Sequence, residues 1–124
     1  MRIGELARRS HASARSIRYY EQRGLFAARR GANGYRDYDE DHLVLVREIR
    51  SLLAGGFDLD EIRPFVDCLH AGIQARGRCP GGLDAYRRKL AELDARIGAL
   101  KALRERLGRD LGRLEADRPE EAAG

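Results

Sequence analysis

The chain has 124 residues, of which 35% are charged, 6% are aromatic and 43% are hydrophobic. This length suits one domain of ordinary size, so a separate regulatory domain is not expected and extra burial would come from a partner chain. The composition favours a mostly helical fold over a sandwich of β-strands. No run approaches the roughly 18 apolar residues of a membrane span, and the start, MRIGELARRS, lacks the apolar core of a secretory signal. We therefore expect no membrane association and a cytoplasmic location.

The net charge of +4 is unevenly distributed along the chain. Residues 1–36 contain nine arginines and two glutamates, a net charge of +7, so the remaining residues carry −3. Clustered arginines neutralise phosphates and release condensed counterions, which is typical of a nucleic-acid-binding surface. A solvated arginine-rich face without a ligand is the alternative that charge alone leaves open.

Two short helices are predicted at the start of the chain. Apolar residues at helical spacing over 3–7 indicate the first helix, and the second begins after Ser13, a good N-cap, and ends at Gly24. Two helices joined by a short turn predict a helix-turn-helix, whose second helix enters the major groove of DNA. A plain helical hairpin is the alternative, but Arg15 and Arg18 lie on a helix that buries little, which argues against it.

The segment GANGYRDY is predicted to form part of a small β-hairpin, or wing. Asn33-Gly34 is the dipeptide most compatible with a type I′ turn, and ARR before it and YRDY after it can pair as strands. Because side chains alternate along a strand, Arg36 and Tyr38 are expected on one face, suited to phosphate and sugar contacts, while Tyr35 packs inward. A hairpin that serves only as a connector is the alternative.

Two further helices and a loop are predicted next. Asp39 caps a third helix that a pair of glycines ends. The predicted buried stripe of this helix consists of Leu43, Val46, Ile49, Leu52 and Leu53. A fourth helix begins with Asp58 and Glu61 at capping-box spacing and is expected to kink at Pro64. Residues 71–82 contain four glycines and a proline and are predicted to be a loop or hinge.

The last third of the chain has a heptad pattern. The a sites are Leu83, Leu90, Ile97, Arg104 and Leu111, and the d sites are Tyr86, Leu93, Leu100, Leu107 and Leu114. An apolar stripe with a period of about 3.5 residues predicts a coiled-coil seam, which needs a partner helix. A long helix folded back on the third and fourth helices is the alternative, but those helices are too short to cover it. Residues 116–124 have no apolar pattern and are expected to be disordered.

The order of these elements resembles a known family. IRYYEQRGL followed by NGYRDYDEDHL, then IRSLLAGGFDLDEI and a long heptad helix, is similar to the mercuric-resistance regulator (MerR) family of transcription factors. The resemblance implies a winged helix-turn-helix DNA-binding domain over residues 1–70, a hinge over 71–82 and a helix over 83–115 that forms an antiparallel coiled coil in a homodimer. The DNA contacts that it implies are Ser13, Arg15, Arg18 and Tyr19 from the recognition helix and Arg30, Arg36 and Tyr38 from the wing. His11 replaces the glycine usual in the turn, and Pro64 is not part of the general pattern.

The resemblance also implies the partners and the mechanism. The partner would be double-stranded promoter DNA with an inverted repeat and a spacer too long for RNA polymerase, and transcription would be controlled by bending and untwisting that spacer. An architectural DNA-binding protein without an effector is the alternative. No enzyme is expected, because the sequence has no catalytic triad, phosphate loop or His/Glu metal motif, and no cofactor is implied. A coiled-coil adaptor without a DNA role is disfavoured by the basic first third of the chain.

Cys68 and Cys79 are candidate redox or effector residues. They are eleven residues apart and could approach disulfide distance if the loop doubles back. The alternatives are a site for a thiophilic metal that uses Cys68, His70 and Cys79, or two inert thiols. The metal-sensing members typically carry a further cysteine-bearing loop after the coil. The sequence has none, so a mercury, copper or zinc sensor of the usual type is not expected.

Overall fold

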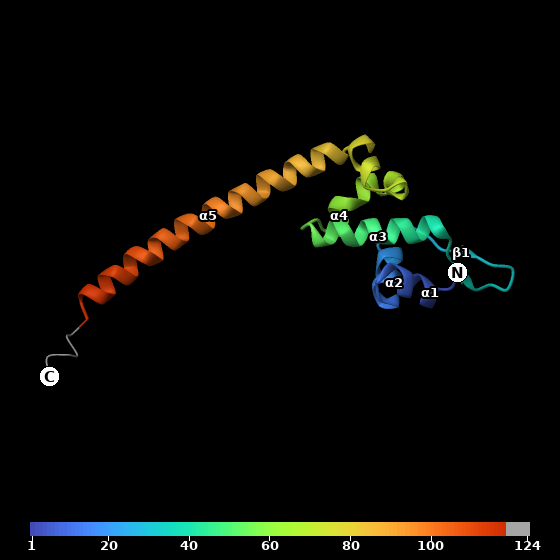
Figure 1. Ribbon diagram of the computed structural model, residues 1–124, viewed down its shortest axis with the longest axis horizontal. Coiled ribbons are helices and arrows are strands. Elements are labelled where there is room, and N and C mark those ends of the chain that lie inside the picture. The colour runs from blue at the N-terminus through green and yellow to red at the C-terminus, as the bar shows by residue number, and fades with distance from the viewer. Residues whose placement is uncertain (119–124) are drawn as a thin grey trace. The chain divides into compact units, whose positions relative to one another are not determined.

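The computed structural model of the protein describes residues 1–118, apart from the side chain of Ile73, so most of the predicted disordered tail lies outside the described residues. The chain forms two compact units: Met1–Lys89, called the head below, and the residues from Leu90 onward, which continue the last helix. The elements in chain order are α1 (Ile3–Ser10), α2 (Ala14–Gln22), β1 (Arg29–Arg30), β2 (Arg36–Asp37), α3 (Glu40–Ala54), α4 (Leu59–Ile62), the 3₁₀-helices η1 (Arg63–Ala71) and η2 (Ile73–Arg78), and α5 (Gly82–Ala116) (Figure 1). The predicted mostly helical class with a small hairpin is confirmed.

The first two helices form a helix-turn-helix whose ends are set by local signals. α1 ends at His11, whose backbone is left-handed (φ 59°, ψ 22°), a conformation that histidine adopts more readily than most non-glycine residues. Ser13 caps α2, because its hydroxyl accepts the backbone N–H of Ser16 at 3.0 Å. At the other end Gly24 has a φ of 79°, and its N–H donates to the carbonyl of Glu21 at 2.9 Å. The cap of α2 and the glycine that follows it agree with the sequence prediction.

The core of the head lies around α3. This helix packs against α1 on one side and against α4 and η1 on the other (Figure 1). α1 and α2 contribute Leu6 and Ile17, which are fully buried. The buried side chains of α3 are Leu43, Leu45, Val46, Ile49 and Leu52. The predicted stripe is therefore largely correct, although Leu53 is only partly buried at the edge of the core.

The wing is the predicted antiparallel hairpin, but its turn differs from the prediction. The strands pair Arg30 with Arg36, which leaves residues 31–35 in the connection, too many for a two-residue type I′ turn. The N–H of Gly34 donates to the carbonyl of Gly31 at 2.9 Å, and Gly34 has a φ of 80°, whereas Asn33 does not have a positive φ. The register of the strands therefore overrides the local preference of the Asn-Gly pair.

The segment between α3 and α5 is more ordered than a loop. Asp58 and Glu61 form the predicted capping box, and the α-helix stops at Ile62, just before Pro64, as the predicted kink requires. Residues 73–78, predicted to be part of a loop or hinge, form the 3₁₀-helix η2. That part of the prediction is wrong, because this glycine-rich segment is fixed by buried contacts that the sequence does not display.

These contacts tie the segment to its neighbours. Cys68 and Cys79 form a disulfide with a Cα–Cα distance of 5.9 Å. Arg76 is 7% exposed; its Nε and Nη2 donate to Oε2 of Glu48 on α3 (2.8 and 2.7 Å), and its Nη1 donates to the hydroxyl of Tyr86 on α5 at 3.0 Å. The segment that precedes α5 is thus bonded to both α3 and the first turns of α5. Tyr86, predicted to be a seam residue, is partly buried within the head.

The second unit carries the apolar stripe of the predicted seam. Its large apolar side chains are between 37% and 69% exposed. They are Leu90, Leu93, Ile97, Leu100, Leu103, Leu107, Leu111 and Leu114. Nothing covers the stripe among the described residues of this unit. Among the described residues, no helix has the length and apolar character needed to cross a membrane.

The close contact at the start of α5 predicts that Gly82→Ala destabilises the protein. A Cβ at Gly82 would lie 2.0 Å from the carbonyl oxygen of Arg76, so backbone would have to move, at a cost of roughly 1–3 kcal/mol. Gly98→Ala on the same helix is the matched control, because a Cβ there meets nothing within 4 Å and should stabilise the helix by up to about 1 kcal/mol. Urea unfolding at one fixed protein concentration measures both. Equal effects of the two variants would contradict the prediction.

Candidate nucleic-acid interface

The outward face of α2 carries the predicted recognition residues. Arg15, Arg18 and Tyr19 are exposed, and Tyr19 is 48% exposed although it is aromatic. Ile17 and Tyr20, on the opposite face, are buried in the core. The helix is therefore anchored by its apolar face and presents two cations and a phenol to solvent, as a helix that reads a DNA groove requires.

Two other predicted contacts have partners within the chain. The hydroxyl of Ser13 also donates to the hydroxyl of Ser16 at 2.9 Å, so it takes part in the cap of α2. Nη1 of Arg30 donates to the carbonyl of Gly34 at 3.3 Å across the wing. Both residues are exposed, and both stabilise the element that they belong to.

Tyr38 does not lie where the sequence predicts it. It is 1% exposed, and its hydroxyl donates to the carboxylate of Glu21 on α2. Burial, together with this hydrogen bond and the charge of Glu21, raises the pKa of Tyr38 to about 12. The expectation that Tyr38 faces outward beside Arg36 is wrong, because β2 ends at Asp37 and strand alternation does not continue into the next residue. In this structure the Tyr38 side chain connects the wing to the recognition helix.

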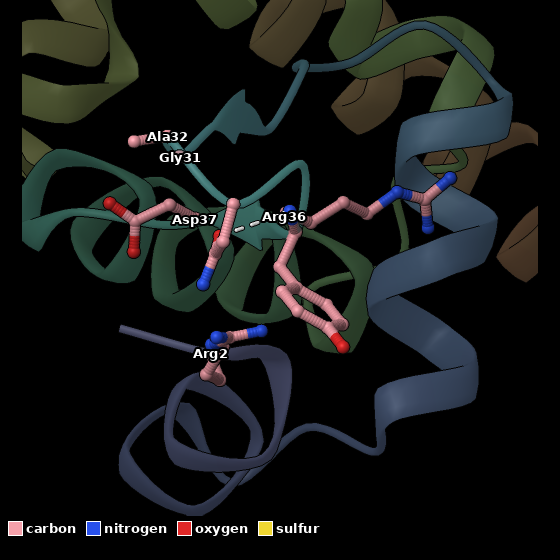
Figure 2. Close-up of a pocket in the computed structure, with 7 residues that line it drawn as sticks. Arg2, Gly31, Ala32, Arg36 and Asp37 are labelled. Carbon is pink, nitrogen blue, oxygen red and sulfur yellow. Dashed lines mark hydrogen bonds between the residues drawn. The ribbon is translucent and has the colours of Figure 1, made fainter.

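Tyr35, expected to pack inward, is instead exposed and forms part of a basic cleft. It is 60% exposed, and the Arg2 guanidinium lies over its ring, 4.2 Å from the centroid. An open cleft of about 490 Å³ is lined by Arg2, Ile3, Arg18, Tyr35 and Arg36. In Figure 2 Arg36 extends from the wing toward α2, while Arg2 approaches the wing from the start of α1. The fold thus brings together three arginines from three parts of the chain, beside the exposed face of α2.

Arg2 and Tyr35 were not predicted as site residues. They are 33 positions apart in the sequence, and their contact depends on how α1 packs beside the wing. The weak signal for Arg2 is its membership of the basic segment 1–36. Membership of that segment does not predict where Arg2 lies relative to the recognition helix.

His42 fixes both ends of the wing. The backbone N–H of Asp39 donates to its Nδ1 at 3.0 Å, so Nε2 carries the proton and donates to the carbonyl of Ala27 at 2.9 Å. Asp39 in turn accepts the N–H of His42, a hydrogen bond that lowers the pKa of Asp39. Ala27 precedes β1 and Asp39 follows β2, so one imidazole ring joins the chain segments that enter and leave the hairpin.

Acidic groups also lie at this surface. The Met1 amino group donates to Oδ1 of Asp37 at 3.0 Å, which lowers the pKa of Asp37. One oxygen of Glu21 lies 4.0 Å from Nε of Arg36. The interface is therefore a cationic surface with two carboxylates among its arginines.

The structure brings the recognition helix and the wing together but does not bring the cysteines to this surface. Cys68 lies in η1 and Cys79 directly after η2, and η1 packs on α3. Within the described residues no group of three or more His, Cys, Asp or Glu side chains is arranged to hold a metal ion.

Comparison with known proteins agrees with this geometry. A family profile described as "MerR HTH family regulatory protein" matches residues 1–67, and a second, "MerR, DNA binding", matches residues 43–109. The chain belongs to the MerR family. Its members are DNA-binding transcription regulators, and this chain is one of them.

Similar proteins cover most of the chain. The HTH-type transcriptional regulator HmrR of Rhizobium leguminosarum bv. viciae is 35% identical, over 86% of this chain and 81% of its own. Heavy metal-dependent transcription regulator 2 of Rhizobium meliloti is 31% identical, over 94% of this chain and 78% of its own. Among solved structures, the transcription regulator PbrR691 of Ralstonia metallidurans CH34, crystallised with lead(II), aligns with a TM-score of 0.70 at 28% identity. The alignment covers 99% of this chain and 91% of PbrR691.

The basic cleft predicts that Arg2→Gln weakens DNA binding in a sequence-independent way. Loss of one cation that faces a phosphate should lower affinity for any duplex and reduce the slope of log affinity against log salt concentration by about one. Arg88→Gln, an exposed position on α5, is the matched control and should leave the slope unchanged. Fluorescence anisotropy across a salt series measures both variants. An unchanged slope for Arg2→Gln would exclude a phosphate contact of this residue.

Proposed function

We propose that this regulator binds a promoter inverted repeat as a homodimer and controls transcription by distorting the DNA between the two half-sites. The observation that carries the proposal is the combination of a cationic surface, formed by α2 and the wing, and an exposed heptad stripe on the same chain. A single head would grip the duplex at the recognition helix and at the wing. A second copy would supply the other half-site and cover the stripe.

The stripe supports a second copy of the chain as the partner. Burial of each large aliphatic side chain contributes roughly 1.5–3 kcal/mol, and α5 exposes a row of them. Nine of the ten a and d positions are apolar, which is the pattern of a coiled-coil seam. We propose the antiparallel arrangement, which would leave the two heads at opposite ends of the paired helices.

Rigid heads support DNA distortion as the mechanism. Because the wing is held by His42 and Tyr38, it cannot adapt freely to a straight duplex, and each head would impose its own geometry on the backbone. Two such heads at a fixed separation can hold the duplex in a bent or untwisted form, which typically costs a few kcal/mol. RNA polymerase at that promoter would then meet its two recognition elements in a changed relative orientation.

Leu100→Asp tests dimerisation and operator binding together. Leu100 is 65% exposed in the single chain, and a carboxylate at this d position should prevent seam formation. We expect a monomer in sedimentation experiments and a loss of operator affinity of at least about a hundredfold, since the two heads no longer bind together. Ala102→Asp, at an outward f position of the same helix, is the control and should remain a dimer with wild-type affinity.

In vitro transcription on templates of different spacer length separates distortion from simple occlusion. We expect the wild-type protein to activate only the template with the overlong spacer and the Leu100→Asp variant to activate neither template. Equal repression of both templates by the wild type would contradict the distortion mechanism. A dimeric Leu100→Asp variant would contradict the proposed seam.

We further propose that the cysteine pair gates this activity through a redox signal. Cys79 is 5% exposed and Cys68 is half-buried, so an oxidant would reach Cys68 first. A small disulfide of the RSSR class would oxidise the two thiols in two exchanges, forming the Cys68–Cys79 bond and releasing two RSH molecules. The 5.9 Å Cα–Cα distance supports this pairing. The disulfide encloses the segment that contains Arg76, whose guanidinium donates to Glu48 on α3 and to Tyr86 on α5.

A metal signal is the other chemistry that the relatives suggest. The names of Heavy metal-dependent transcription regulator 2 and of the PbrR691–lead(II) complex refer to metals. We favour the redox signal because the described residues hold no metal-ligand cluster and both cysteine sulfurs are bonded to each other.

Cysteine substitution tests the redox proposal. For the wild type we expect operator affinity or promoter activation to change at least about threefold between reducing buffer and buffer with oxidised glutathione, by thiol–disulfide exchange. Cys68→Ser and Cys79→Ser should each abolish that difference. A response to lead(II) or another thiophilic ion that survives under reducing conditions would favour a metal instead. Activity that is the same in all conditions would favour an architectural protein without an effector.

A further inference from the structure

Glu21 lies where the recognition helix meets the wing. It belongs to the last turn of α2, and its side chain is 13% exposed. Its carboxylate accepts the hydroxyl of the buried Tyr38, while its other oxygen lies 4.0 Å from Nε of Arg36. Arg36 is 51% exposed and also lines the basic cleft. One carboxylate therefore contacts a structural residue of the wing and one of its candidate phosphate-binding cations.

We propose that Glu21 competes with DNA phosphate for Arg36, and thereby lowers the affinity of this regulator for duplex DNA while it holds the wing against the recognition helix. The inference rests on the proposed function in that duplex DNA is taken as the ligand of the cleft. Glu21 is a positioning residue, since it acts on DNA through Arg36 and Tyr38.

The charges around Glu21 support competition. Arg18 and Arg36 both lie close enough to the Tyr38 hydroxyl to act on it electrostatically, so the carboxylate sits among the cations of the interface. A phosphate that binds Arg36 would come within a Debye length of Glu21, about 8 Å at physiological ionic strength, where like charges still repel. The ion pair is long and its Arg36 side chain is half exposed, so it is weak enough to open when DNA arrives.

The hydrogen bond from Tyr38 moderates that competition. A hydroxyl that donates to a carboxylate stabilises its charge and directs one oxygen away from Arg36. Without this donor the carboxylate would turn fully to Arg36, whose Nε already lies 4.0 Å from its other oxygen. Removing the charge of Glu21 and removing the hydroxyl of Tyr38 should therefore change DNA affinity in opposite directions.

Two substitutions in the full chain test the inference. Glu21→Gln keeps an acceptor for the Tyr38 hydroxyl but removes the charge, so affinity for operator and for unrelated duplex should both rise at least about threefold. The salt slope should also steepen by up to one. Tyr38→Phe should lower both affinities, and in the Glu21→Gln background it should have no further effect. Glu105→Gln, an exposed position on α5, controls for net charge and should change nothing.

The outcomes separate this inference from the proposed function. If both substitutions lower affinity, Glu21 is only a structural ligand of Tyr38 and the inference is wrong. If Glu21→Gln still raises affinity when Arg36 is replaced by Ala, the competition does not involve Arg36. If the wild type itself ignores duplex DNA at low salt, the proposed function fails instead. Thermal unfolding of each variant identifies any that fold poorly, and the double-variant comparison is then made at a temperature where all are folded.

Discussion

The burial of Tyr38 between the wing and α2 is the constraint on which the arrangement of the exposed arginines depends. A wing of two-residue strands has little stability of its own, because a lone hairpin in water is marginal. Here the Tyr38 hydroxyl is bonded to Glu21 on α2, its backbone N–H donates to Met1, and His42 joins the chain before β1 to the chain after β2. Arg36 is consequently held at a fixed place relative to Arg18, and the two cations act as one surface.

Features that depend on neighbouring residues could be predicted from the sequence. Ser13, Asp39 and Asp58 each cap a helix, because the side chain that satisfies a free backbone N–H lies only three residues from it. The kink at Pro64 follows from the missing N–H of proline. The heptad stripe is equally local, since a helix of known period fixes which residues share a face.

Features that depend on packing could not be predicted. Asn33-Gly34 favours a type I′ turn, yet the pairing of Arg30 with Arg36 fixes a longer connection. The alternation rule put Tyr38 outside, yet the strand ends one residue earlier and the ring enters the core. The stacking of Arg2 on Tyr35 joins distant parts of the chain, and only a tertiary contact creates it. In each case the structure is determined by a contact between residues distant in the sequence and not by the local sequence preference.

The segment before α5, residues 71–82, shows both a local preference and a tertiary contact. Its glycines favour a flexible backbone, but Arg76 is buried there and bonded to Glu48 and Tyr86. A buried ion pair adds little net stability, because two charges must leave water, but breaking one is costly and its geometry is directional. The first turns of α5, which belong to the head, are held by a directional polar contact with Arg76 and by apolar packing, because Ala85 and Tyr86 join the core cluster. The disulfide ties the segment just before α5 to η1. The start of α5 is therefore fixed within the same packed unit that holds the helix-turn-helix.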